Sequence, residues 1–583
     1  MMADVKRLGV YLKDYLKESI LSPLFKLLEA LMDLLVPLVV AYAINEGIGN
    51  GDNNVIIRCF VLLIALAIAG MLFSFTAQYF AAKASVGFAT RLRQSLFDHI
   101  LSLSYKELDA SGSDTLISRM TSDINQLQTG VNMSLRLLLR SPFIVFGSMI
   151  MAFMIDVRSA LIFVISIPVL SAVVFGIMYV SIPLFAKAQH ALDKLLGITR
   201  ENLSGVRVIR AFCKEDDEIR EFDEKAHDLT LINEHVGRLS ALMNPLTYVI
   251  VNIATIILIR YSAFRVYAGQ IRQGDVVALY NYMAQIIVEL IKLASLTITI
   301  NRSIACGDRV AKILELRSSM SYKTEEIRQT GEIAVRFSDV SFAYNNSSAD
   351  SLENASFEIR KKETVGIIGS TGSGKSTLAN LICRFYDVDK GKVEVLGHDV
   401  KDYPQGVLLE KIGIVPQKAV LFEGSIRDNL KWGNESASDE DLYEAISIAQ
   451  ATEVIANKKD GLDEWIEQGG RNLSGGQRQR LTIARALVKK PEILIMDDSA
   501  SALDFATDFR LRKAIRQLKD MTVFIVSQRC SSVKDADKIL VLNDGMIVGQ
   551  GSHEELLTAC KTYQEIYYSQ FPEQRPENKE VFA

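Results

Sequence analysis

Six long apolar stretches limit what this chain of 583 residues can fold into. Each stretch is long enough to cross a bilayer, which takes about 20 residues in a helix. Lipid offers no hydrogen-bond partners, so a spanning segment must satisfy its own backbone groups, as a helix does. The stretches lie at approximately 20–44, 56–80, 134–155, 159–183, 242–264 and 275–299. The amino-terminal half is therefore predicted to be an all-α transmembrane domain of six helices.

The connections between these stretches alternate in length. Those at 45–55, 156–158 and 265–274 are short, whereas those at 81–133 and 184–241 are long and keep a helical pattern. The long ones are rich in Lys and Arg, which favours the cytoplasmic side. The sequence thus predicts a multi-pass protein of a bacterial plasma membrane, with both termini and the long loops in the cytoplasm.

Composition excludes one class of partner. The net charge of −4 argues against a nucleic-acid binder, because such binding depends on attraction to phosphates. The six cysteines show no metal-ligand spacing, which indicates free thiols. The lipid bilayer is the expected environment, and no nucleic acid is expected as a partner.

A change of pattern after the sixth stretch marks a second domain. A polar linker is followed by short apolar strands that alternate with helices, including a helix predicted at 508–518. This alternation is typical of an α/β domain. We predict a transmembrane domain at 1–318, a linker at 319–332, an α/β nucleotide-binding domain at 333–570 and a carboxy-terminal tail at 571–583.

The second domain carries a phosphate-binding motif. Gly369-Ser-Thr-Gly-Ser-Gly-Lys375-Ser376 fits G-x-x-x-x-G-K-[ST], and it lies between an apolar strand and a helical stretch. Backbone N–H groups of such a loop surround phosphates, and the helix N-terminus favours negative charge. Lys375 is expected to reach the β- and γ-phosphates and Ser376 to bind Mg²⁺. A chance glycine-rich turn is the alternative, which the strand and helix around it disfavour.

A second motif, about a hundred residues later, indicates a family. Leu473-Ser-Gly-Gly-Gln477 is followed by an apolar strand that ends in Asp497-Asp498. With the phosphate loop, this pattern resembles the ATP-binding-cassette (ABC) ATPases. From roughly 15 to 570 the chain resembles a half-transporter of the ABC exporter type. The resemblance implies that two cassettes close head to tail, with each ATP between the phosphate loop of one and the Ser-Gly-Gly-Gln of the other.

The same resemblance implies ATP and Mg²⁺ as cofactors and assigns residues to them. An aromatic is expected to stack on adenine, although Tyr344 could instead be a buried core residue. The residues assigned to ATP are Tyr344, Gly369, Ser370, Thr371, Gly372, Ser373, Gly374, Lys375, Ser376, Thr377 and Gln417. Those assigned to Mg²⁺ are Ser376, Gln417 and Asp497, and those assigned to the partner's ATP are Ser474, Gly475, Gly476 and Gln477.

Two positions depart from the family. Asp498 stands where the family has the glutamate that acts as general base, and Gln528 stands where it has a histidine that contacts the γ-phosphate. Asp is one methylene shorter than Glu, and a misplacement of about 1 Å can cost a hundredfold in rate. Gln can donate a hydrogen bond but cannot carry charge. Both changes together indicate a site that binds ATP and hydrolyses it slowly or not at all.

The intact signature beside an impaired site predicts an unequal pair of subunits. The partner is expected to be a second half-transporter that supplies the catalytic Glu and the histidine opposite this chain's signature. Alternatives are a homodimeric exporter of lipids or peptides with two weak sites, and an ATP-binding regulatory membrane subunit. An importer is disfavoured, because importers usually keep membrane and cassette parts on separate chains.

The sequence says less about the transported substrate. Resemblance to multidrug exporters implies a small lipophilic or drug-like compound. Glu29 and Asp33 share one face of the first span, and Glu289 and Lys292 share one face of the sixth. Charged groups at membrane depth usually face a cavity or each other. These four residues are therefore expected either to bind substrate or to form internal ion pairs. The long cytoplasmic loops are expected to reach the cassettes near 105–112 and 208–214, although plain solvated loops are the alternative.

Overall fold

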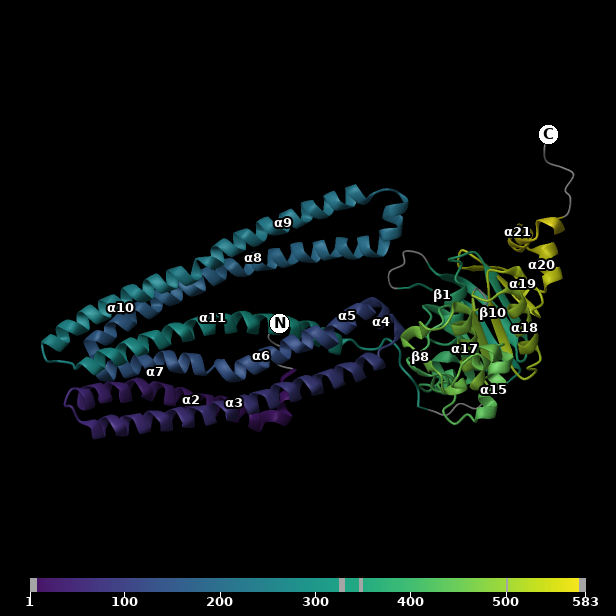
Figure 1. The fold of residues 1–583 in the computed structure, drawn as a ribbon. Coiled ribbons are helices and arrows are strands. Elements are labelled where there is room, and N and C mark those ends of the chain that lie inside the picture. The colour runs from purple at the N-terminus through teal and green to yellow at the C-terminus, as the bar shows by residue number, and fades with distance from the viewer. Residues whose placement is uncertain (1–7, 325–330, 345–349, 500–501, 576–583) are drawn as a thin grey trace. The chain divides into compact units, whose positions relative to one another are not determined.

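The computed structural model describes residues 8–324, 331–344, 350–499 and 502–575 and divides into two compact units. The first unit is entirely helical and contains the candidate membrane spans (Figure 1). Its helices are η1 (Gly9–Tyr15), α2 (Leu16–Tyr42), η2 (Ala43–Ile48), α3 (Asn53–Ser102), α5 (Ser113–Ser118), η3 (Arg119–Asp123), α6 (Ile124–Leu137), α7 (Arg140–Ile155), α8 (Val157–Ala211), α9 (Glu215–Ala241), α10 (Met243–Tyr267) and α11 (Gln273–Glu315).

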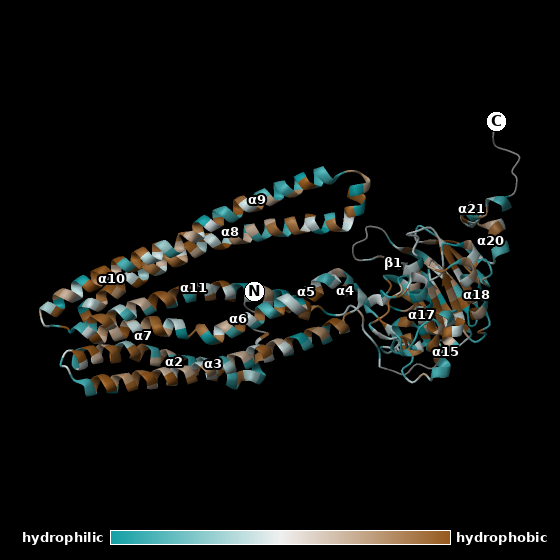
Figure 2. Ribbon diagram, in the orientation of Figure 1, coloured by the Kyte–Doolittle hydropathy of each residue, from teal (hydrophilic) through white to brown (hydrophobic). Residues whose placement is uncertain are grey.

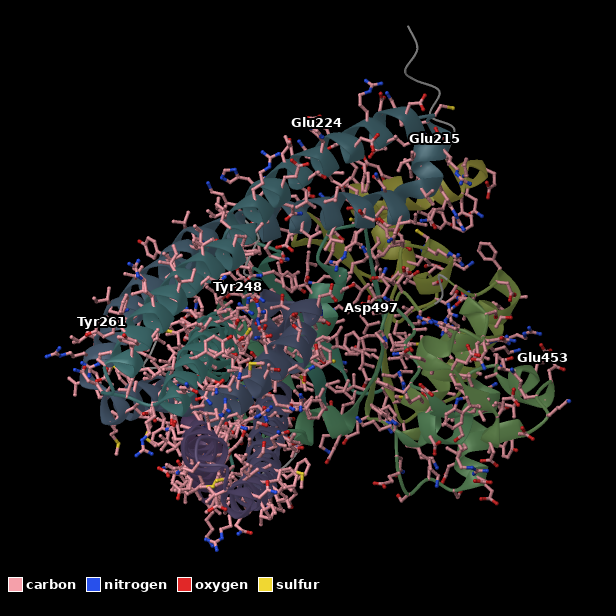
Figure 3. The ribbon with its side chains drawn as sticks, turned by 60° about the vertical axis from the view of Figure 1, so that its left-hand side comes forward. Glu215, Glu224, Tyr248, Tyr261, Glu453 and Asp497 are labelled. Atoms are coloured by element: carbon pink, nitrogen blue, oxygen red, sulfur yellow. The ribbon has the colours of Figure 1, made fainter. Side chains whose placement is uncertain are left out.

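Among the described residues, six helical segments are long and apolar enough to cross a membrane, as predicted. The long connections are not irregular loops but continuations of the spanning helices. The α8 helix runs for 55 residues, and α9 returns after a short turn to lead into α10. Figure 2 shows this change of character, since α10 is largely hydrophobic and α9 largely hydrophilic. Figure 3 places Glu215 and Glu224 along α9 and Tyr248 and Tyr261 along α10.

The α11 helix forms much of the core of this unit. Ala278, Tyr282, Ile286 and Leu290 recur every four residues and are at most 4% exposed. That spacing produces a single buried stripe, which packs against α2, α7 and α10. The Tyr282 hydroxyl donates to the Leu34 carbonyl at 2.7 Å, so its polar end is also satisfied inside the helix bundle.

The second unit is an α/β domain that also includes a short segment from between two spans, Ser102–Gly112. Its strands are β1 (Ile333–Phe342), β2 (Leu352–Arg360), β3 (Thr364–Gly369), β4 (Lys390–Val395), β5 (His398–Asp399), β6 (Ile412–Val415), β7 (Gly424–Ser425), β8 (Trp465–Ile466), β9 (Ile493–Asp497), β10 (Thr522–Val526), β11 (Lys538–Asn543) and β12 (Met546–Gly551). Its helices are α4 (Tyr105–Ser111), α12 (Lys375–Ile382), η4 (Val400–Asp402), α13 (Val407–Lys411), α14 (Ile426–Lys431), α15 (Asp439–Ile448), α16 (Thr452–Ala456), η5 (Gly461–Asp463), η6 (Gln468–Gly470), α17 (Gly475–Val488), α18 (Phe505–Arg516), α19 (Cys530–Val533), α20 (His553–Ala559), α21 (Lys561–Gln570) and η7 (Pro572–Gln574).

The central sheet has six strands in the order β12-β11-β3-β10-β9-β6. Strands β3, β9 and β10 are buried on both faces, which explains their continuous apolar sequence, whereas the edge strand β12 is partly exposed. In β9, Ile493 and Ile495 join one apolar cluster, whereas Leu494 and Met496 join the other. A separate antiparallel sheet has the order β2-β1-β4-β5. The prediction of an α/β domain after an all-α membrane domain is confirmed.

One predicted boundary differs, and a cap explains it. The helix expected from residue 508 begins at Phe505, because the Asp504 side chain accepts a hydrogen bond from the Thr507 N–H at 2.9 Å. A carboxylate at this position satisfies one of the unpaired donors of the first turn.

Candidate functional site

The sheet topology gathers the phosphate loop and the acidic residues at one edge. Strands β3, β10 and β9 are adjacent and parallel, with Val526 aligned to Ile367 on one side and to Asp497 on the other. Parallel neighbours end at the same edge, so the loop after β3, Asp497 and the segment after β10 converge there. This edge is the carboxyl end of the sheet, where α/β folds bind ligands.

Between β3 and α12, glycines allow the phosphate loop to turn tightly. Gly372 and Gly374 adopt φ values of +83° and +95°, a region that favours glycine. A Cβ atom at Gly374 would lie 2.5 Å from the Ser351 carbonyl oxygen. The loop then delivers Lys375 and Ser376 at the first turn of α12, where backbone N–H groups and the helix dipole favour an anion.

Lys375 is the main positive group of the site. Its ammonium donates to the Gly369 and Ser370 carbonyls at 3.0 and 2.5 Å, and the residue is only 8% exposed. Burial lowers the pKa of the Lys375 ammonium, and the nearby carboxylates of Asp498 and Asp497 oppose that shift. A buried cation among backbone amides is suited to a phosphate chain.

Next to the lysine is a set of oxygen ligands. The Ser376 hydroxyl donates to Asp497 Oδ1 at 3.1 Å, and Gln417 lies just beyond the end of β6. Burial raises the pKa of the Asp497 carboxyl. Hydroxyl, carboxylate and amide oxygens are hard ligands, and Mg²⁺ prefers such ligands when it also binds phosphates. The residues present therefore fit the predicted Mg²⁺: Ser376, Gln417 and Asp497 would hold it, and it would supply positive charge to a bound phosphate chain.

These residues line one cavity of about 320 Å³. Its walls include most of the predicted site and two residues that the sequence did not suggest, Ser351 and Val526. The predicted residues in its lining are Tyr344, Thr371, Gly372, Gly374, Lys375, Ser376, Thr377, Gln417, Asp497, Asp498 and Gln528. Gly369, Ser370 and Ser373 lie outside the lining. Gly369 and Ser370 instead supply the carbonyls that hold Lys375.

Asp498 has an unusual backbone. Its φ is +42°, a region that residues other than glycine seldom adopt, and its N–H donates to the Val526 carbonyl at 2.9 Å. Burial raises the pKa of the Asp498 carboxyl, while Lys375, Arg529 and a hydrogen bond from Gln417 oppose the shift. The strained turn fixes where the short carboxylate side chain begins.

Tyr344 lies on the wall of the same cavity, half-buried rather than enclosed in the core. Its ring meets Phe342 and Tyr386 edge to face, with centroids 4.9 and 5.2 Å apart. Its hydroxyl donates to Thr377 Oγ1 at 3.4 Å. Tyr344 is thus part of the cavity lining, and its stacking on adenine stays a prediction.

The second motif lies outside this cavity. Ser474 caps α17, and its N–H donates to the Gln477 side chain at 2.9 Å while Gln477 N–H donates back to Ser474 Oγ at 3.3 Å. A Cβ atom at Gly475 would meet no described atom of this chain within 4 Å. Packing within the chain therefore gives no reason for glycine at 475, whereas close approach of an external group does.

The α4 helix contacts the cassette directly. The rings of Tyr105 and Phe385 are 4.7 Å apart, and the Tyr386 hydroxyl donates to the carboxylate of Asp109. Burial and the Asp109 carboxylate raise the pKa of Tyr386, so it stays protonated as the donor. The segment expected to couple near 105–112 thus packs on the nucleotide unit. The second segment, 208–214, forms the turn between α8 and α9, and its coupling role stays a prediction.

The intramembrane charges form a network with two bases that the sequence did not suggest. Arg140, at the start of α7, binds Glu289 at 2.7 Å and Asp33 at 2.9 Å. Lys292 binds Glu289 at 2.9 Å, and Lys26 pairs with Glu29. Three acids and three bases therefore meet across α2, α7 and α11. Internal ion pairs, one of the two expectations for these residues, are present.

Comparison with known proteins agrees with this architecture. The family model described as the ABC transporter transmembrane region matches residues 19–290, and the ABC transporter model matches residues 352–501. A probable multidrug resistance ABC transporter ATP-binding/permease protein of Bacillus subtilis, YheI, is 33% identical over 82% of each chain. The ATP-dependent lipid A-core flippase of Vibrio vulnificus is 30% identical over 88% of this chain and 89% of its own.

A solved structure shows the same fold. The bacterial Atm1-family ABC exporter with ATP bound superposes with a TM-score of 0.80 at 23% identity, covering 96% of this chain and 99% of its own. Family models, relatives and fold agree on an ATPase domain fused to six candidate spans. The chain therefore belongs to the ABC transporter family, as an exporter half-transporter that joins a multi-pass membrane domain to a cytoplasmic ATP-hydrolysing domain.

Proposed function

We propose that this chain is one subunit of a heterodimeric exporter and that it retains ATP at an impaired site while its partner hydrolyses ATP. The observation that supports this most is the pairing of Asp498 and Gln528 in one cavity with Lys375 and Asp497. The residues that bind phosphate and Mg²⁺ are those of the family, whereas both residues that act on the γ-phosphate are replaced.

A shorter acid has a direct geometric effect in this setting. The backbone of Asp498 is held by its hydrogen bond to Val526, so the side chain cannot advance by shifting the main chain without breaking that contact. A misplacement of about 1 Å reduces a catalytic rate by roughly a hundredfold. Gln528 offers a neutral donor where the family has an imidazole, which further weakens stabilisation of developing charge.

The partner is proposed to be a second half-transporter with Glu and His at these positions. This chain's Ser474–Gln477 would face the partner's ATP, which fits the open space around Gly475. Purification of the tagged chain from its native membrane should recover a second ABC chain in equal amount. Recovery of this chain alone, with vigorous ATPase activity, would instead support the homodimer.

The transported compound is proposed to be lipophilic or drug-like. In the membrane unit, a cavity of about 420 Å³ lies between α2, α7 and α11, a size that suits a drug-sized ligand. Apolar Val36, Pro37, Ile144 and Val288 share its wall with polar Asn281 and Gln285 and with Asp33, Arg140 and Glu289 of the ion-pair network. The names of the drug-resistance and flippase relatives agree with an amphipathic substrate.

Restoring the family residues tests the impaired site. Asp498→Glu combined with Gln528→His should raise single-turnover ATP hydrolysis at this chain's site by about a hundredfold, because both catalytic groups return. The control carries the same exchanges at exposed positions of the same domain, Asp520→Glu with Gln517→His. If the unaltered site already cleaves ATP as fast as the partner's site, the proposal is wrong.

ATP-dependent uptake into inverted vesicles separates transport from regulation. A lipophilic dye should accumulate only when this chain and its partner are both present. ATP binding without any uptake, in vesicles that contain both chains, would favour the regulatory subunit.

A further inference from the structure

The segment after β10 is held by a side chain from the carboxy-terminal helix. The amide of Gln570, at the end of α21, contacts the backbone on both sides of Arg529. Its Nε2 donates to the Gln528 carbonyl at 2.8 Å, and its Oε1 accepts from the Cys530 N–H at 2.8 Å. One side chain therefore replaces the two hydrogen bonds that a neighbouring strand would provide.

The rest of this segment depends on few other contacts. Ser527 N–H donates to the Ile367 carbonyl at 3.0 Å, which is the last backbone bond toward β3. Arg529 N–H donates to Ser527 Oγ at 3.0 Å. Beyond Ser527, the Gln528 carbonyl is thus bound to another element through the Gln570 amide.

Fixing the backbone also fixes the directions of two side chains. Arg529 has extended φ and ψ values of −87° and 119°, and successive side chains of an extended segment point to opposite sides. Gln528 lines the nucleotide cavity with Lys375 and Asp498. The Arg529 guanidinium lies 5.0 Å from the ring centre of Phe505, the first residue of α18.

The helix that carries Gln570 is itself firmly anchored. Tyr563 and Tyr567 are 0% and 7% exposed in the cluster that covers one face of the central sheet. The Tyr563 hydroxyl is 2.8 Å from His553 Nδ1 of α20. Gln570 therefore extends from a rigid base, and its amide can hold the segment that it contacts.

We propose that Gln570 is a positioning residue that keeps Gln528 directed at the terminal phosphate and so sets how long a nucleoside triphosphate stays bound. The inference rests on the proposed nucleotide site. It adds a residue of α21 that acts on that site from outside the nucleotide cavity. Gln570 does not touch nucleotide, and its effect passes through the backbone at Gln528 and Cys530.

The consequence is selective for the terminal phosphate. A freed segment would have to be ordered again whenever Gln528 engages the γ-phosphate, and that cost lowers the affinity for triphosphate. A diphosphate lacks the group that Gln528 is placed to contact. Loss of Gln570 should therefore shorten the binding of triphosphate and leave the binding of diphosphate unchanged.

The experiment compares dissociation of two radiolabelled nucleotides from the purified full-length transporter in the presence of Mg²⁺. The triphosphate probe is the non-hydrolysable β,γ-imido analogue of ATP, and the diphosphate probe is ADP. Gln570→Leu keeps the size of the side chain and removes both hydrogen bonds. It should speed release of the analogue by about threefold to tenfold, as loss of two partly exposed hydrogen bonds implies, with ADP release within about twofold of wild type.

Two further variants sharpen the result. Gln570→Glu keeps an acceptor for the Cys530 N–H but sets a carboxylate oxygen against the Gln528 carbonyl, so it should speed release of the analogue at least as much as Gln570→Leu. Gln564→Ala is the matched control, because Gln564 lies on the same helix and donates to the Leu557 carbonyl at 2.7 Å. It should leave both dissociation rates unchanged. If Gln570→Leu fails to fold, Gln570→Glu provides the same comparison.

Equal acceleration for analogue and ADP would show a merely structural role and overturn the inference, as would no acceleration at all. Because the analogue is not cleaved, its release does not depend on how fast this site hydrolyses ATP. Brisk hydrolysis by the unaltered site would refute the proposed function and leave this comparison intact.

Discussion

The two units of the molecule treat charged side chains in opposite ways. In the membrane unit, three acids and three bases from α2, α7 and α11 bind one another, with Arg140 among three carboxylates. In the nucleotide unit, Lys375, Asp497 and Asp498 line a cavity of about 320 Å³. Charges in the first unit pair directly with each other, and Asp33, Arg140 and Glu289 among them also border a cavity. Charges in the second unit border a cavity together with the backbone of the phosphate loop.

The difference teaches how a charged cluster can be interpreted. A buried charge without a partner is costly, so direct ion pairs among buried charges indicate a role in fixing helix positions. The nucleotide cavity instead brings a cation, backbone N–H groups and metal-binding oxygens together around one space. That combination is suited to a ligand that carries both phosphate and Mg²⁺.

The largest effect is expected when the ion-pair network of the membrane unit loses its central base. Arg140→Ala leaves Glu289, which is 3% exposed, with a buried carboxylate that Lys292 and Ser141 only partly compensate. We expect a loss of about 3–5 kcal/mol in stability, measured as a lower thermal unfolding midpoint of the purified protein.

The contrast with an exposed pair makes this test specific. Arg272→Ala removes the partner of Glu46 at an exposed position and should change stability by about 0–1 kcal/mol. Arg140→Met combined with Glu289→Gln should recover part of the loss, because the buried Glu289 carboxylate is then gone, while the more exposed Asp33 and Lys292 each lose a partner. Equal effects of Arg140→Ala and Arg272→Ala would contradict a buried ion-pair network.

A large effect on binding, not on stability, is expected at the cavity. Lys375→Ala removes the cation that the phosphate loop holds, and the affinity for ATP should fall by about a hundredfold, or roughly 2–3 kcal/mol. Equilibrium binding of labelled ATP measures this loss. Lys362→Ala, which removes an exposed lysine paired with Asp520 at 2.7 Å, serves as control and should leave affinity unchanged.

The smallest effect is expected at the hydrogen bond from the Tyr386 hydroxyl to the Asp109 carboxylate. Tyr386→Phe removes the hydroxyl that donates to Asp109. It keeps the ring contacts with Tyr344 and Tyr105. Unfolding of the cassette should become easier by about 1 kcal/mol. Tyr443→Phe, at an exposed position of α15, is the control. A loss as large as that from Arg140→Ala would show that this contact is more than one hydrogen bond.

Local patterns in the sequence predicted most of the fold. Spans follow from long apolar runs, and β9 follows from a short apolar run between turn signals, because both depend on neighbours in sequence. The phosphate loop was predicted with its strand and helix for the same reason. The start of α18 was missed because Asp504 caps it through one hydrogen bond, which apolar periodicity does not reveal.

Long-range contacts could not be predicted. Arg140 is 149 residues from Glu289, and a single basic residue at the start of an apolar stretch gives no sign of its partner. Gln570 lies 42 residues from Gln528 and belongs to no motif. Ser351 joins the cavity only through the pairing of strands. In each case the contact arises from packing of distant segments, and no local pattern encodes it.

The placement of α4 has a consequence for how the molecule is made. Residues Ser102–Gly112 leave the ribosome between two spans, yet they pack with a unit whose remaining residues begin at Arg317. Tyr105 packs on Phe385, roughly 280 residues later in the chain, so at about 5–20 residues per second about 14–56 s of synthesis separate the two. During that interval Tyr105 has no surface to pack on. Biogenesis therefore imposes an order in which the bilayer must accept the early helices before the cytoplasmic domain can be completed.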